Sequence, residues 1–201
     1  MIAIINYDAG NLRSVEKAFL YLGEDVTVTN DPKDILSADR VVLPGVGAYR
    51  DAMDKLKNAD LVGVVKEVID KKTPFLGICL GMQLMYEYSE EGDAEGLGIL
   101  KGTVKRFPAE SGLKIPQIGW NQLEVQKKSL LLKGADSAPF VYFVHSYYVD
   151  AEDKSTVSAT VTYGAKADVL AETENIHLTQ FHPEKSSSAG LLMLKNFATG
   201  E

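Results

Sequence analysis

The sequence lacks the features of an exported, membrane-spanning or nucleic-acid-binding protein. One cysteine in 201 residues excludes an intrachain disulfide framework and fits a reducing compartment. The start, MIAIINYD, has too short an apolar run for a secretory signal, and no later run approaches the ~18 apolar residues that span a bilayer. The net charge is -7 without a basic cluster, which disfavours nucleic acid and anionic membranes as partners. These absences predict a soluble, cytoplasmic protein.

The composition is that of an ordinary globular chain, with 45% hydrophobic and 24% charged residues. Without repeats or a linker, we expect one domain over residues 1–201. In the first half, apolar runs alternate with amphipathic segments, which predicts a parallel sheet with helices on both faces. We expect strands at 2–6, 25–29, 39–43 and 74–78, helices at 12–22 (N-capped by Asn11), 48–57 and 61–71, and a helical turn after Asp31-Pro32.

The second half is rich in Val, Thr, Tyr and Phe, which favours strands, some of them antiparallel. The expected strands cover 98–107, 139–150, 156–163, 167–173 and 176–181, and a helix near 187–198 closes the chain. The expected fold class is therefore α/β, a mixed but mostly parallel sheet with antiparallel strands in the C-terminal half.

The single cysteine, Cys79, lies in FLGICLGMQL at residues 75–84, between Gly77 and Gly81. A lone cysteine is more often a small buried hydrophobic residue. Here a strand, Gly-Ile-Cys-Leu-Gly and a helix follow one another, which is the nucleophile-elbow pattern with sulfur in place of oxygen. The elbow places the sulfur at a helix N-terminus, where the thiolate is favoured. The pattern therefore predicts a nucleophile.

A thiolate nucleophile needs a base, and the chain has only three histidines, His145, His177 and His182. His182 lies in QFHPE after a strand-like segment, two residues before Glu184. In an extended chain these two side chains share a face, so Glu184 can orient His182 toward the sulfur. The alternative is a surface histidine beside a solvated glutamate. Combined with the elbow, the pattern favours a Cys–His–Glu triad.

The expected chemistry also needs an oxyanion hole. The Leu80 N–H, directly after the nucleophile, is one candidate donor. Pro44-Gly45-Val46-Gly47 follows an expected neighbouring strand, and its N–H groups at Val46 and Gly47 are the other candidates. An ordinary Gly/Pro turn explains this stretch equally well.

GICLGMQ, with HPE at residues 182–184, resembles the class I (triad) glutamine amidotransferases over nearly the whole chain. These two motifs leave open the members that serve carbamoyl phosphate, anthranilate and GMP synthesis. Further stretches are similar to the glutaminase subunits of imidazole glycerol phosphate synthases, of histidine biosynthesis. They are NYDAGNLRS (6–14), LPGVGAY (43–49), PQIGWN (116–121), FVHSYY (143–148) and FHPEKSS (181–187). The resemblance implies a flavodoxin-like three-layer fold.

The resemblance also implies roles for individual residues. Cys79, His182 and Glu184 would hydrolyse glutamine to glutamate and ammonia through a thioester, without a cofactor or metal. The residues implied to bind glutamine are Gly45, Gln83, Glu91, Ser146 and Tyr147, with Glu91 meeting the ammonium group. A separate (β/α)8-barrel cyclase subunit would form a heterodimer with the chain, receive the ammonia and make imidazole glycerol phosphate and an aminoimidazole carboxamide ribotide. The residues implied to face it are Asn11, Trp120, Tyr142 and Lys185.

The loop after Pro44 departs from the Pro-Gly-Gly of most triad amidotransferases, because Val46 follows Gly45. A β-branched residue resists positive φ. We therefore hypothesise that the isolated chain has an incomplete oxyanion hole, and that the liganded cyclase shifts this loop to an active conformation.

Three other functions remain open on the residues alone: a cysteine peptidase or γ-glutamyl hydrolase on a similar sheet, a glutaminase for another synthase, and a non-catalytic interaction subunit. Gln83 and HPEKSS favour the amidotransferase over a peptidase. The presence of all three triad residues disfavours a non-catalytic subunit.

Overall fold

The computed structural model describes residues 1–109 and 112–200. Its helices are α1 (Leu12–Tyr21), α2 (Pro32–Ser37), α3 (Tyr49–Asn58), α4 (Leu61–Asp70), α5 (Leu80–Gln83) and α6 (Ser187–Thr199), with 3-10 turns η2 (Lys154–Thr156) and η3 (Pro183–Lys185). The strands of the first half are β1 (Ile2–Ile5), β2 (Val26–Thr29), β3 (Arg40–Gly45), β4 (Phe75–Cys79), β5 (Tyr86–Ser89) and β6 (Ala94–Glu95). Those of the second half are β7 (Leu100–Arg106), β8 (Gln117–Gln122), β9 (Glu124–Val125), β10 (Phe140–His145), β11 (Tyr147–Ala151), β12 (Val157–Thr162), β13 (Lys166–Glu172) and β14 (Ile176–Thr179).

A large mixed sheet runs through the molecule in the order β2-β1-β3-β4-β14-β13-β11-β7-β5-β6. The run from β2 to β14 is parallel, whereas β13 pairs antiparallel with its neighbours β14, β11 and β12. β8 and β10 form a separate antiparallel ribbon. The expected α/β fold, mostly parallel at first and antiparallel in the C-terminal half, is confirmed.

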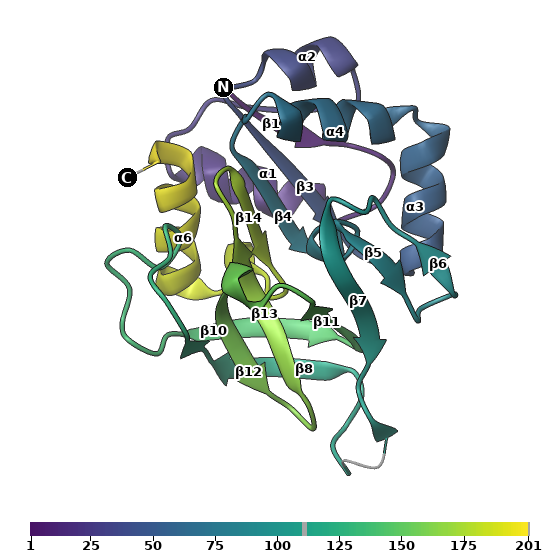
Figure 1. Ribbon diagram of the computed structural model, residues 1–201. Coiled ribbons are helices and arrows are strands. Elements are labelled where there is room, and N and C mark those ends of the chain that lie inside the picture. The colour runs from purple at the N-terminus through teal and green to yellow at the C-terminus, as the bar shows by residue number, and fades with distance from the viewer. Residues whose placement is uncertain (110–111, 201) are drawn as a thin grey trace.

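Helices cover both faces of the parallel strands (Figure 1). Strand side chains alternate between faces, so Ile2 and Ile4 join a buried cluster with α1 and α6, while Ala3 and Ile5 join one with α2, α3 and α4. Strands buried on both faces explain the continuous apolar runs in the sequence.

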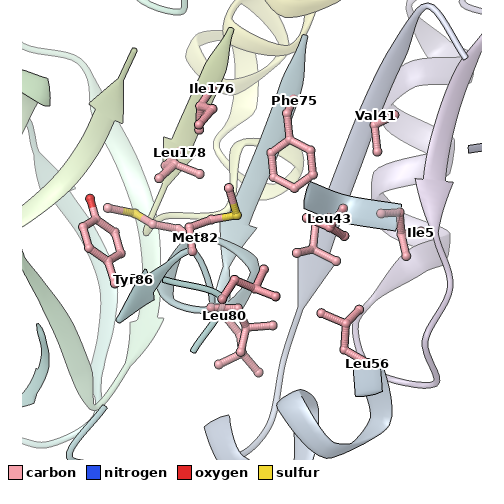
Figure 2. Close-up of a cluster of buried hydrophobic side chains, with 14 of the residues drawn as sticks. Ile5, Val41, Leu43, Leu56, Phe75, Leu80, Met82, Tyr86, Ile176 and Leu178 are labelled. Carbon is pink, nitrogen blue, oxygen red and sulfur yellow. The ribbon is translucent and has the colours of Figure 1, made fainter. Parts of the chain in front are cut away.

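Figure 2 shows part of the cluster on the side of α2, α3 and α4, where side chains from β1, β3, β4 and β14 meet those of α3 and α5. Leu80 and Met82 of α5 are both buried in it. Each buried side chain of this size contributes about 1.5–3 kcal/mol relative to exposure. The segment that follows Cys79 is therefore anchored in the core.

Several sequence expectations differ from the structure. The strand expected at 139–150 is two strands in different sheets, β10 and β11, which meet at Ser146. Four strands were not anticipated, namely β5, β6, β8 and β9. β8 and β9 pair with the distant strands β10 and β12, and β5 and β6 form a short hairpin, so pairing overrides weak local patterns. Asn11 precedes α1, but its side chain forms no capping hydrogen bond. Among the described residues, no helix is long and apolar enough to cross a membrane.

Candidate active site

Cys79 occupies a sharp bend between β4 and α5. It is the last residue of β4, and its backbone adopts φ 54° and ψ -109°, which is unfavourable for an L-residue. A side chain at Gly81 would collide with the Leu43 carbonyl oxygen, and one at Gly77 would lie 2.7 Å from Leu178. The bend therefore requires both glycines, as the elbow pattern predicts.

The helix after the bend is only one turn, with 4 residues, because the chain turns away after Leu84 into β5. A helix dipole grows with the number of aligned peptide units. The electrostatic support that we expected the sulfur to receive from a helix is therefore smaller than predicted, and neighbouring side chains must supply more of it.

His182 and Glu184 form a buried pair beside the sulfur. The His182 Nδ1 lies 2.8 Å from the Glu184 Oε1, and the two side chains are 2% and 1% exposed. The extended-chain argument for this contact is wrong, because Pro183–Lys185 is a 3-10 turn. The turn folds the carboxylate back onto the imidazole, so the predicted pair forms by a different geometry.

Burial lowers the pKa of His182, but the neighbouring Cys79 and Glu184 outweigh burial and raise it to about 10. The His182 Nε2 is buried and forms no hydrogen bond of normal geometry with any described residue. The influence of Cys79 on this pKa nevertheless places the sulfur next to the ring. A histidine that keeps its proton at neutral pH stabilises a thiolate beside it and can later donate the proton.

The Pro44–Gly47 loop lies against the elbow because β3 and β4 are paired. Gly45 is the register partner of Cys79 at the ends of these strands. The Tyr7 hydroxyl donates a hydrogen bond of 2.9 Å to the Pro44 carbonyl, which fixes the start of the loop. Gly47 takes φ 107°, whereas Val46 does not adopt positive φ.

A cavity of about 320 Å³ opens beside the sulfur, a size that suits a small ligand. Its lining includes all three expected oxyanion residues and four of the five residues implied to bind glutamine. These are Val46, Gly47, Leu80, Gln83, Glu91, Ser146 and Tyr147. Gly45, in the same loop, is buried and does not line the cavity.

The side chains of Gln83 and Glu91 in this cavity already have protein partners. The Gln83 amide donates to the Tyr147 carbonyl at 3.0 Å and to the Gln180 Oε1 at 2.9 Å, which leaves its own oxygen for a ligand. Glu91 accepts a 3.1 Å hydrogen bond from the Tyr49 N–H. Burial raises the pKa of Glu91 despite this bond. A cationic group in the cavity would favour its charged form.

A family model described as glutamine amidotransferase class-I matches residues 3–200. The chain belongs to the class I glutamine amidotransferases. Its curated relatives include imidazole glycerol phosphate synthase subunits HisH. That of Acaryochloris marina is 50% identical over 199 residues, 98% of this chain and 93% of the relative. That of Syntrophotalea carbinolica is 49% identical over 203 residues, 98% of both chains. The resemblance seen in the motifs, to the class I amidotransferases and to the glutaminase subunits of imidazole glycerol phosphate synthases, is confirmed.

Solved structures share the fold of this amidotransferase at low identity. A putative GMP synthase protein from Thermoplasma acidophilum has a TM-score of 0.74 at 22% identity, covering 98% of this chain and 92% of that one. A PurLQS structure from Thermotoga maritima has a TM-score of 0.76 at 18% identity, covering 99% and 97%. These likenesses confirm the class I amidotransferase fold.

The structure adds two residues of the amidotransferase site that the motifs did not single out. Gln180 is fully buried, and its amide donates to the Cys79 sulfur at 3.6 Å. His145 lines the cavity, and its Nδ1 lies 2.7 Å from the Tyr147 carbonyl. Burial lowers the pKa of His145 to about 4, so the ring is neutral. Both residues lie within the quoted stretches QFHPE and FVHSYY, but only the fold brings them to the sulfur and the cavity.

The four residues implied to face a cyclase lie on neighbouring elements, since η3 packs against both α1 and β10. Asn11 precedes α1, Lys185 is exposed on η3, and Tyr142 lies on β10. Trp120 of β8 is 50% exposed. Its ring meets that of Tyr142 edge-on, with 6.0 Å between centroids.

Proposed function

We propose that this amidotransferase is the glutaminase subunit of an imidazole glycerol phosphate synthase, and that Cys79, His182 and Glu184 carry out the hydrolysis. The observation that supports this role most directly is a strained, buried sulfur at the edge of a cavity of about 320 Å³, close enough to a buried imidazole–carboxylate pair to raise the pKa of the imidazole. Glutamate and ammonia are the expected products.

In the first half-reaction, the Cys79 thiolate attacks the side-chain carbonyl carbon of glutamine. The resulting oxyanion would be held by N–H groups of Leu80 and of the Val46–Gly47 loop, and each such donor is worth about 100- to 1000-fold in rate. When the intermediate collapses, the C–N bond breaks and the His182 Nε2 gives its proton to the departing nitrogen. Ammonia leaves, and a γ-glutamyl thioester remains on the sulfur.

In the second half-reaction, His182 changes from acid to base. Thioester formation removes the thiolate charge that helps to raise the pKa of His182, while burial continues to lower it. The neutral ring can then take a proton from water, which attacks the thioester and releases glutamate. Glu184 orients the ring through both steps.

The proposed acceptor of the ammonia is a (β/α)8-barrel cyclase that docks on Asn11, Trp120, Tyr142 and Lys185. An exposed tryptophan packed edge-on against a tyrosine is a typical interface anchor. We expect Trp120→Ala to weaken binding of the cyclase about 30-fold in a titration. Thermal unfolding of the variant chain should stay unchanged because the side chain is half exposed. Unchanged affinity would contradict this interface.

The proposed gating by the cyclase is consistent with the conformation of Val46, which does not take the positive φ that we associate with an active loop. The test measures glutamate release by the chain alone and by the chain with its cyclase and a nucleotide ligand. A faster rate in the liganded complex is expected, and equal rates would contradict gating. Without the cyclase, glutamate and ammonia should appear in equal amounts, and cleavage of peptides would instead favour the peptidase alternative.

A further inference from the structure

The Cys79 sulfur accepts a hydrogen bond from a residue outside the triad. The Gln180 Nε2 lies 3.6 Å from the Sγ, a normal length for a bond to sulfur. Gln180 directly follows β14, and its backbone N–H is bound to the Val169 carbonyl at 2.9 Å. The side chain is therefore carried on a fixed backbone, two residues before His182, and both side chains reach the same sulfur.

The surrounding hydrogen bonds determine which end of the Gln180 amide faces the sulfur. The Tyr147 carbonyl can only accept, so Gln83 must present its NH2 group there, at 3.0 Å. The same NH2 group reaches the Gln180 side chain at 2.9 Å, which must therefore present its oxygen. The Gln180 NH2 group is left on the side of Cys79. The chain of donors runs from Gln83 through Gln180 to the sulfur.

Gln180 has no route to a ligand. It is 0% exposed and does not line the cavity beside Cys79, whereas Gln83 does. Among the described residues, the Cys79 sulfur is the one acceptor for its NH2 group. A buried anion needs donors in place of the water it has lost, and a bond to a charged acceptor is stronger than one to a neutral acceptor. Because α5 is a single turn, its dipole supplies little of this support.

We propose that Gln180 is a catalytic residue that stabilises the Cys79 thiolate through its amide N–H, and that Gln83 is the positioning residue that fixes this amide. The inference rests on the proposed role of Cys79 as nucleophile. In the first half-reaction the negative charge moves from the sulfur to the oxyanion, so Gln180 acts before attack, by keeping the sulfur ionised. Among the described residues, the Gln180 amide forms the one hydrogen bond to this buried sulfur, because the His182 Nε2 has no partner of normal geometry.

The test is the rate of Cys79 alkylation by iodoacetamide against pH in the full-length chain. Gln180→Met keeps the size of the side chain but removes the donor, and Gln180→Glu places a carboxylate oxygen beside the sulfur. Both should move the midpoint of the curve upward, by about one pH unit for Gln180→Met and further for Gln180→Glu. The rate well below the midpoint should fall about tenfold or more. Gln83→Met should also move the midpoint upward, but by less than Gln180→Met.

Gln126→Met is the matched control, because Gln126 also donates two hydrogen bonds, to the Glu124 carbonyl and the Thr160 hydroxyl, away from the elbow. Its alkylation curve should match that of the unaltered chain. The other titratable groups around the sulfur, Tyr7, His145, His182 and Glu91, are the same in every variant, so a shift reports the amide. A merely structural role would lower rates without moving the midpoint.

An unchanged midpoint in folded Gln180→Met or Gln180→Glu overturns the inference, as does an equal shift in Gln126→Met. If Gln180→Met unfolds, Gln180→Glu and Gln83→Met carry the same test. Iodoacetamide needs no glutamine binding, so this result is separate from the glutaminase assay. With the cyclase present, Gln180→Met should lower kcat about tenfold at neutral pH, recover at alkaline pH, and leave KM within twofold.

Discussion

A buried histidine–glutamate pair lies near each end of β14, and the two pairs differ in what surrounds them. Beyond the carboxyl end, His182 and Glu184 are 2.8 Å apart. At the amino end, His177 and Glu172 are 2.9 Å apart and almost as deeply buried. Only the first pair lies beside a sulfur.

In the pair at the amino end, the fold satisfies both oxygens of the carboxylate. Glu172 also accepts from the Leu131 N–H at 3.3 Å and the Ser158 hydroxyl at 3.2 Å, so it joins a loop and β12 to the sheet. Burial alone would raise the pKa of Glu172, but His177 foremost, followed by Ser129 and the Leu131 N–H, holds it below its ordinary value. This pair has the character of a structural contact.

The pair at the carboxyl end keeps unused hydrogen-bonding capacity. Among the described residues, neither the His182 Nε2 nor the Glu184 Oε2 has a partner, although both atoms are buried. Unsatisfied buried polar atoms are costly and uncommon in native proteins. A histidine paired with a carboxylate therefore does not by itself mark a catalytic site. A free ring nitrogen beside a nucleophile marks one.

Replacing each of the two histidines with asparagine should give the largest difference in kcat between the two pairs. His182→Asn removes the acid and base of both half-reactions and should lower kcat for glutamine at least about 10⁴-fold. His177→Asn should leave kcat within about threefold. Glutamate release by the complex with the cyclase measures both. Similar losses in the two variants would contradict the comparison.

Changing the two glutamates should separate catalysis from stability. Glu184→Gln leaves His182 without its orienting charge and should reduce kcat about 10³-fold. Glu172→Gln should keep kcat but lower the free energy of unfolding by about 1–3 kcal/mol, because a buried network loses a partner. Urea unfolding and steady-state rates of both variants provide the measurement. A stable Glu172→Gln chain with low kcat would contradict the structural role given to Glu172.

The two histidines near the sulfur should respond to pH with opposite signs. The pKa of His145 is lowered to about 4, so between about 4 and 6.5 the unfolded chain binds more protons and stability falls as pH decreases. The loss is at most about 3 kcal/mol. The pKa of His182 is raised to about 10, so its contribution is lost as pH rises from about 6.5 to 10.

Unfolding of the unaltered chain and of His145→Gln across about pH 4 to 10 tests this prediction. We expect the variant to lose less stability toward acid than the unaltered chain, while both lose stability in the same way toward alkaline pH. Parallel curves on the acid side would show that His145 is protonated in the folded chain.

The sequence predicted the catalytic elements well because close packing dictates their motifs. Gly77 and Gly81 are needed because Leu178 and the Leu43 carbonyl leave no room for side chains. A predicted contact can also form for another reason than the one given, since the 3-10 turn at Pro183, and not an extended chain, joins His182 to Glu184.

What the sequence did not predict depends on distant pairing. Gln180 reads as the interior of a strand, and only the parallel pairing of β14 with β4, which sets Thr179 opposite Ile78, brings it to Cys79. The bend at Ser146 between β10 and β11 is likewise set by their different partner strands, β8 and β7. Local propensity gives no signal for either feature.

Every step proposed above requires the Cys79 sulfur to attack a glutamine bound in the adjacent cavity. The direct test of this attack is treatment of the chain–cyclase complex with a chloroketone analogue of glutamine, followed by mass spectrometry of its peptides. We expect one adduct per chain, on Cys79, which excess glutamine prevents and which His182→Asn greatly slows. An unmodified Cys79, or labelling that glutamine does not suppress, would contradict the account.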